Sequence, residues 1–146
     1  MIHHHLLLRV VTKLLVGVIM LFAFYVQFHG DFSPGGGFQA GVIMAVAFII
    51  YGIVFGLKTV QDVLPRWFVH KMVAAGVLIY AGTGVISMLM GYDFLDYDAL
   101  DPKYPVNGQH IGLLLVEFGV GVTVTGVMIA IFYAFAGRVP RIEDEW

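Results

Sequence analysis

Four long stretches of the chain contain almost no charged residues, and short segments rich in polar residues separate them. Their apolar residues are distributed all round the expected helices, which is typical of helices surrounded by lipid and other helices. A bilayer core of ~30 Å is crossed by ~20 helical residues, and each stretch is long enough. We therefore predict an all-α integral membrane protein with a single membrane domain over residues 1–146. The four predicted transmembrane helices lie at about 6–28, 34–57, 70–90 and 111–136, with an outer loop at 91–110.

The composition agrees with this pattern and excludes several other classes of protein. Of the 146 residues, 60% are hydrophobic and 12% are charged, and the mean hydropathy is +0.89. A soluble domain is ~45–50% apolar and ~25% charged, so a soluble chain of this length could not bury so much apolar surface. The net charge of −2 does not indicate the basic surface that a nucleic-acid-binding protein would have. The chain has no cysteine, which excludes thiolate metal sites, and we predict neither a metal site nor a cofactor.

The lysine and arginine residues set the predicted orientation of the spans. Seven of the eight lie on one side of the predicted membrane, and only Lys103 lies on the other. Because positive charges concentrate in cytoplasmic segments, both termini are predicted to be cytoplasmic. The outer loop is acidic. The seven residues on the predicted cytoplasmic side are Arg9, Lys13, Lys58, Arg66, Lys71, Arg138 and Arg141.

Small residues recur at four-residue spacing in two of the predicted spans. This spacing lets helix backbones approach closely, which is how helices associate where lipid removes the hydrophobic driving force. It predicts close packing, either among the four helices of this chain or with helices of other subunits. The residues are Gly37, Gly41, Ala45, Gly52 and Gly56 in the second span, and Gly126, Ala130 and Ala134 in the fourth.

A glycine-rich segment joins the first span to the second. Pro34 precedes three glycines, Gly35–Gly37, which favours a tight turn whose backbone can approach another element. Ser33 and Pro34 suit the N-cap and the first position of the second helix. The segment lacks the Lys-Ser/Thr of a P-loop and follows no strand, so it is not a nucleotide-binding loop. Two interpretations stay open: a structural hinge that closes the hairpin, or a polar lining near a cation route that uses His29 and Asp31.

Glu117 is the one acidic residue inside a predicted span. A charge near the bilayer centre costs at least ~2.5 kcal/mol on insertion scales, so a carboxylate there requires a partner, a proton or a cavity. His110 lies seven residues earlier, two turns away on the same helical face, and the pair could accept protons or cations. The uncharged stretch 118–137 could also span the membrane alone, which would leave Glu117 at the outer interface in a hydrogen-bonded helix end. Both alternatives are open.

Two segments resemble the signature of one membrane-protein family. The run Phe28–Gly41 (FHGDFSPGGGFQAG) closely resembles the signature of the B subunit (MrpB/MnhB) of multisubunit Mrp-type Na+/H+ antiporters. Asn107–Gly112 (NGQHIG), which leads to Val116–Gly126 (VEFGVGVTVTG), looks like the last span of that family. The length, the four spans and the order of the motifs match over nearly the whole chain. The resemblance marks six positions as its structural motif: Pro34, Gly35, Gly36, Gly37, Phe38 and Gly41.

The resemblance implies an accessory membrane subunit with no turnover of its own. Mrp antiporters are assemblies of six or seven hydrophobic subunits in the cytoplasmic membrane of bacteria or archaea, so the implied partners are subunits of the A, C, D, E, F and G types. They exchange internal Na+ for external H+ and support Na+ resistance and pH homeostasis. A separate hypothesis, which rests on membrane depth and not on the family pattern, places four residues on an ion path: His29, Asp31, His110 and Glu117.

Two other functions are open from the sequence. Similar B-like subunits occur in membrane-bound hydrogenases and related complex I-like redox enzymes, where the subunit would couple redox chemistry on other chains to ion movement. A stand-alone small channel would have to oligomerise around polar pore-lining faces, and the predicted spans contain few polar residues. We therefore rank the antiporter subunit first, the redox-linked subunit second and the channel last.

Overall fold

The computed structural model describes residues 2–30 and 35–138, with side chains described from Leu6 onward. Within these residues all regular elements are helical. Four helices are long and apolar enough to cross a membrane, so the predicted all-α multi-pass membrane protein is confirmed. The long helices are α1 (Ile2–Phe28), α2 (Gly37–Phe55), α4 (Arg66–Leu89) and α5 (Pro105–Ala136), and the short ones are α3 (Leu57–Val63) and the 3-10 helix η1 (Tyr97–Leu100).

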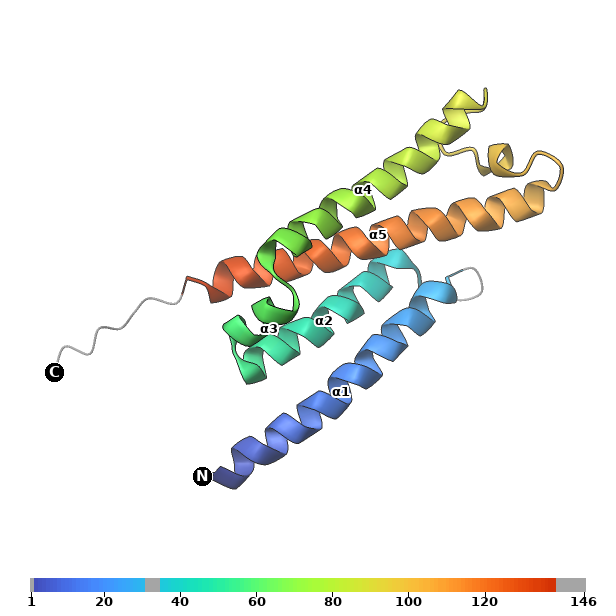
Figure 1. Cartoon of the computed structure of the whole chain (residues 1–146). Helices are drawn as coiled ribbons and strands as arrows, with labels where there is room; N and C mark the ends of the chain where they lie inside the picture. Colours follow the sequence, from blue (N-terminus) through green and yellow to red (C-terminus); the bar gives the residue numbers. More distant parts are fainter. Residues whose placement is uncertain (1, 31–34, 139–146) are drawn as a thin grey trace.

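The four long helices lie in the spatial order α1, α2, α5, α4, so the last two are exchanged relative to their order in the chain (Figure 1). α2 packs on both α1 and α5, and α4 packs on α5. The start of α1 and the end of α5 lie at the same end of the molecule, here called the termini end, and η1 lies at the opposite end, here called the η1 end. Which side of the membrane the termini occupy stays a prediction.

α2 begins later than the sequence predicted. Gly36 is the N-cap and Gly37 is the first helical residue, three residues after the predicted start of the span at residue 34. Gly36 has an extended backbone, with φ 175° and ψ −162°, and Gly35 before it is also non-helical. Consecutive glycines lose much conformational freedom in a helix, which accounts for the late start. Ser33 and Pro34 lie outside the described residues.

A short helix, α3, interrupts the connection between α2 and α4. Gly56 ends α2 with a φ of +98°, a left-handed value that favours glycine, and the chain then enters α3. Apart from its chain neighbours, no described atom lies within 4 Å of a Cβ built on Gly56. Gly56 therefore forms a turn and does not provide the helix packing that its spacing predicted.

The buried core lies near the termini end, where α3 and the start of α4 meet α2 and α5. The hydroxyl of Tyr133 in α5 donates a hydrogen bond to the carbonyl of Leu64, at 2.8 Å, and so ties α5 to the segment after α3. This core consists of Ala45, Val60, Leu64, Val69, Ile129 and Tyr133.

Glycines bring α5 into backbone contact with both of its main neighbours. A Cβ built on Gly119 would lie 2.9 Å from the carbonyl oxygen of Gly76 in α4. A Cβ built on Gly41 of α2 would lie 2.7 Å from a carbonyl oxygen of α5. Gly126 faces α4, whereas Ala134 is exposed. Much of the predicted small-residue packing is therefore found within this chain.

α5 begins at Pro105, before the start near residue 111 that the sequence predicted for the fourth span. Proline suits the first helical position because its missing N–H has no partner to lose there. η1 packs against one face of the extra turns. A Cβ built on Gly112 would overlap the ring of Tyr97, and one on Gly108 would lie 2.6 Å from the Tyr97 carbonyl oxygen. The two glycines of the NGQHIG segment therefore make room for the outer loop.

Candidate functional site

The carboxylate of Glu117 lies against the turn that connects α1 to α2. A Cβ built on Gly36 would lie 2.8 Å from Glu117 Oε1, and one on Gly30 would overlap the carboxylate. A Cβ on Gly37 would overlap the main-chain carbonyl oxygen of Glu117. We call these three residues, Gly30, Gly36 and Gly37, the glycine cradle. Only glycine at these positions leaves the room that Glu117 occupies.

The cradle brings together the two segments that carried the family resemblance. Gly36 and Gly37 come from the first segment, and Glu117 comes from the second, about eighty positions later in the sequence. The glycines predicted to allow close backbone approach do so here, and the element they approach is α5. The glycine turn and Glu117, which the sequence identified as separate features, are therefore in contact.

The depth of Glu117 follows from the length of α2. Its 19 residues span about 28 Å at ~1.5 Å per residue, which is close to the thickness of a bilayer core. Glu117 contacts Gly37, the first residue of α2, so it lies near one boundary of the hydrocarbon layer, on the side of the η1 end. The residue is half-buried between the helices. Glu117 therefore lies between the helices and beside the first turn of α2, and whether it is intramembrane or interfacial stays a prediction.

The two histidines predicted for the ion path lie at different distances from the cradle. His29 is exposed at the end of α1, directly before Gly30 of the cradle, and its ring stacks on Tyr25 with centroids 4.4 Å apart. His110 is exposed on the extra turns of α5, two turns from Glu117 toward the η1 end. The described residues therefore place one histidine beside the cradle and one beyond it.

The remaining motif residues have different surroundings. Phe38 is 60% exposed, and so offers its ring to lipid or to another chain. Gly35 is half-buried next to Val26, and Gly41 is buried against α5. Asp31 and Pro34 lie outside the described residues.

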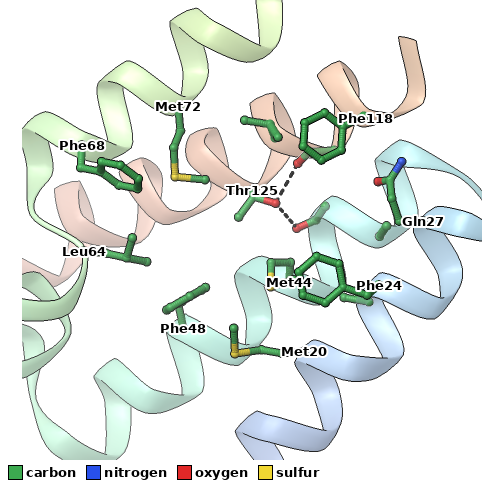
Figure 2. Close-up of a pocket in the computed structure, with 15 residues that line it drawn as sticks. Met20, Phe24, Gln27, Met44, Phe48, Leu64, Phe68, Met72, Phe118 and Thr125 are labelled. Carbon is green, nitrogen blue, oxygen red and sulfur yellow. Dashed lines mark hydrogen bonds between the residues drawn. The ribbon is translucent and has the colours of Figure 1, made fainter. Parts of the chain in front are cut away.

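Sequence reasoning missed a polar line that continues from Glu117 toward the termini end. Gly121 and Thr125 follow Glu117 at four-residue intervals and so lie on one face of α5. The Thr125 hydroxyl donates to the carbonyls of Gly121 and Gly41, at 2.7 and 3.1 Å (Figure 2). Gln27 of α1 reaches the same place, since its Oε1 lies 2.5 Å from a Cβ built on Gly121. The four-residue spacing, together with an amide inside an apolar run, was the signal that could have revealed this line.

The arrangement can hold a proton or a monovalent cation at a carboxylate in a partly dehydrated place. An intramembrane acid is by default a functional candidate, because its burial has a cost that packing alone does not offset. Among residues 2–30 and 35–138, the structure has no group of three or more His, Cys, Asp or Glu side chains that could hold a metal ion.

Fold and site together define a multi-pass helical membrane protein with one carboxylate seated in a glycine turn. Residues 7–130 match the family described as "Domain related to MnhB subunit of Na+/H+ antiporter". The chain belongs to this family, so the resemblance inferred from the sequence is confirmed.

Two staphylococcal proteins show the extent of the likeness. Both are provisionally named antiporter subunit mnhB2, one from Staphylococcus haemolyticus (strain JCSC1435) and one from Staphylococcus aureus (strain Newman). Each is 36% identical to this chain over 132 residues, which cover 89% of this chain and 93% of the relative. The matched residues therefore extend over at least part of each of the four long helices.

Proposed function

We propose that this chain is an accessory membrane subunit of a multisubunit Na+/H+ antiporter. Membership of the MnhB family over residues 7–130 carries this proposal. The names of the two relatives favour an antiporter over the redox-linked complex that the sequence left as an alternative. The exchange of internal Na+ for external H+ by the complex would support Na+ resistance and pH homeostasis.

The chain contributes part of an ion route and not the whole of it. Glu117 is the one acidic residue in the four long helices. A single carboxylate near one boundary cannot carry an ion through a hydrocarbon layer of ~30 Å, because the rest of the path would be apolar. The other ion-binding groups therefore belong to other subunits, which we expect to be of the A, C, D, E, F and G types.

Within that route, Glu117 serves as a proton or Na+ acceptor at one mouth. Its half-buried position in the cradle supports this role, because the carboxylate is both reachable and partly dehydrated. His110 and His29, with Asp31 beside the cradle in sequence, extend the polar residues from Glu117 toward the aqueous side.

The proposed orientation places the termini end in the cytoplasm of a bacterium or an archaeon. Basic side chains gather at this end: Arg9 and Lys13 of α1 both lie over the ring of Phe55, at 5.8 and 5.6 Å from its centroid. Arg66 opens α4 close to Gly137, which follows α5. Basic residues on one side favour the cytoplasmic face of the cytoplasmic membrane. Glu117 then lies at the outer mouth, where external protons arrive.

The test is Na+/H+ antiport in everted membrane vesicles that contain the complete set of subunits. We expect antiport to be lost without this chain and restored when it is supplied. We expect Glu117→Gln to assemble at the wild-type level but to lose most antiport, because the amide keeps the size of the side chain and cannot take up a proton. Normal antiport by Glu117→Gln across alkaline pH would remove the ion-acceptor role. Co-purification of Fe–S or Ni-containing subunits would overturn the antiporter assignment.

A further inference from the structure

A groove of about 410 Å³ lies between α1 and α4, with α2 and α5 as its floor (Figure 2). α1 and α4 do not pack extensively on each other, and the α1–α4 groove occupies the space between them. Its lining is almost wholly apolar, and the Glu117 carboxylate is not part of it. The lining residues that matter here are Met20, Met44, Met72, Phe48, Gln27 and Thr125.

Gln27 is the unusual member of this lining. The residue is 8% exposed, and its side chain makes no hydrogen bond within the described residues. A side-chain amide offers two N–H donors and a carbonyl acceptor, and those of Gln27 keep some exposure at the groove, because the fully buried polar atom without a partner among the described residues is Gln61 Nε2. Thr125, the other polar residue of the groove, already donates its proton to two backbone carbonyls. An occupant of the groove would therefore complete the hydrogen bonding of Gln27.

The need for a hydrogen-bonding partner for Gln27 limits which class of molecule could occupy the groove. A lipid acyl chain would fill the apolar part but leave the amide unsatisfied. A water molecule could bond to the Gln27 amide, but it would leave the apolar remainder of the lining uncovered. A transmembrane helix supplies both parts, because its own backbone is satisfied internally while its side chains can be apolar or hydrogen-bonding.

Two further observations favour a protein occupant. Three methionines line the groove, and these unbranched side chains repack readily around inserted groups. α1 is also the least covered of the long helices, with 11% of its most apolar window buried against 28% for α2 and for α5. A helix placed over the groove would cover α1 and join it to α4.

We propose that a transmembrane helix of another subunit packs over the α1–α4 groove and inserts apolar side chains and one hydrogen-bonding side chain, which pairs with the Gln27 amide. The groove admits side chains and not a whole helix, whose diameter is ~10 Å. This inference rests on the proposed function, because it requires a complex with other membrane subunits.

The first experiment places a benzoylphenylalanine photo-crosslinker at Phe48, inside the groove, in the purified complete complex. The same crosslinker at Phe22, a 53% exposed residue of α1 outside the groove lining, is the control. We expect Phe48 to crosslink to one apolar helix of another subunit that has a Ser, Thr, Asn, Gln or His within one turn of the crosslinked residue. Crosslinks from Phe48 to lipid alone, in a complex that contains all its subunits, would overturn the inference and leave the proposed function intact. Failure of the wild-type chain to co-purify with other subunits would overturn both.

The second experiment compares Gln27→Leu with Gln27→Asn. Because Gln27 has no hydrogen bond within the chain, Gln27→Leu should leave the unfolding temperature of the isolated chain in detergent unchanged. The same variant should lower recovery of the crosslinked subunit by about threefold to tenfold, the size expected for one hydrogen bond between membrane helices. Gln27→Asn keeps the amide and should recover part of the loss. Wild-type recovery with Gln27→Leu would contradict the proposal.

Discussion

Helix α5 packs on α4 on one side and on the α1–α2 hairpin on the other. Glycines allow close approach at both interfaces, but the groups that they contact differ. Toward α4, Gly119 and Gly76 allow direct backbone contact, and the atoms that meet there are backbone groups, the Thr123 hydroxyl and an apolar side chain. Toward the α1–α2 hairpin, Gly36 and Gly37 also allow close approach, but part of the space is taken by the Glu117 carboxylate. A glycine in a membrane helix thus indicates close contact, and the residue it meets decides whether the contact encloses an ionisable group.

The kind of atom that each glycine contacts also determines how the protein would respond to an alanine substitution there. Where the obstacle is a backbone carbonyl, an added methyl group forces the helices apart. Where the obstacle is the end of a flexible side chain, the side chain can turn aside, and the site is altered while the fold is kept. The comparison can therefore be tested with alanine substitutions at glycines whose obstacles differ.

The largest effects are expected for Gly37→Ala and Gly76→Ala. A Cβ on Gly37 would overlap the carbonyl of Glu117, and one on Gly76 would lie 2.5 Å from the carbonyl of Gly119. Each variant should be destabilised by about 1–3 kcal/mol, the usual cost of overpacking. The measurement is thermal unfolding in detergent.

Gly17→Ala is the control, because no described atom beyond its neighbours lies within 4 Å, and it should be neutral or slightly stabilising. Wild-type stability of either variant would contradict the assigned contacts.

A smaller effect on stability, with a clear effect on function, is expected for Gly36→Ala. Its Cβ would lie 2.8 Å from Glu117 Oε1, so the carboxylate must leave the cradle while the backbone can stay. The complex should assemble, and antiport in everted vesicles should fall as it does for Glu117→Gln.

Gly126→Ala is the matched control for Gly36→Ala. Its Cβ would lie 2.8 Å from Cγ2 of Val73, again a side chain, but no ionisable group is present there. Gly126→Ala should keep antiport and lose only some stability. Equal loss of antiport in both variants would show that the position of Glu117 is not the cause.

The sequence predicted most of this fold because bilayer thickness and charge-free stretches constrain helix number and length strongly. It also identified the glycine turn and Glu117 as separate features. It could not show that they meet, since contact between α2 and α5 depends on the exchange of the last two helices in space. The short helix α3 was missed because Gly56, counted as a packing residue, acts as a turn at positive φ.

For the candidate site, too, the sequence revealed individual residues but not the contacts between residues that are far apart in the chain. The chemistry of Glu117 could be inferred from its isolated charge in an apolar run, whereas the role of Gln27 depended on its neighbours from α2 and α5. An amide in a membrane helix is common at a helix end. Its place in a groove, without a hydrogen bond from the described residues, emerges only from packing.

The smallest effect is expected at a third glycine contact, where Tyr97 of η1 lies on Gly112 of α5. Burial raises the pKa of the Tyr97 hydroxyl above its ordinary value of 10, and the nearby Tyr80 adds to the shift. A raised pKa means that the folded state holds the proton more tightly, so this contribution to stability is complete below pH 10 and is lost as the pH rises through the raised pKa. The unfolding temperature of the wild-type chain should therefore fall more steeply above pH 10 than that of Tyr97→Phe, which has no proton to lose.

The effect is small because Tyr97 is only half-buried, and Gln109 still donates to Asp98 at 2.7 Å to hold the loop. Parallel curves for the two proteins across this pH range would show that η1 is held by its apolar contacts and this hydrogen bond alone.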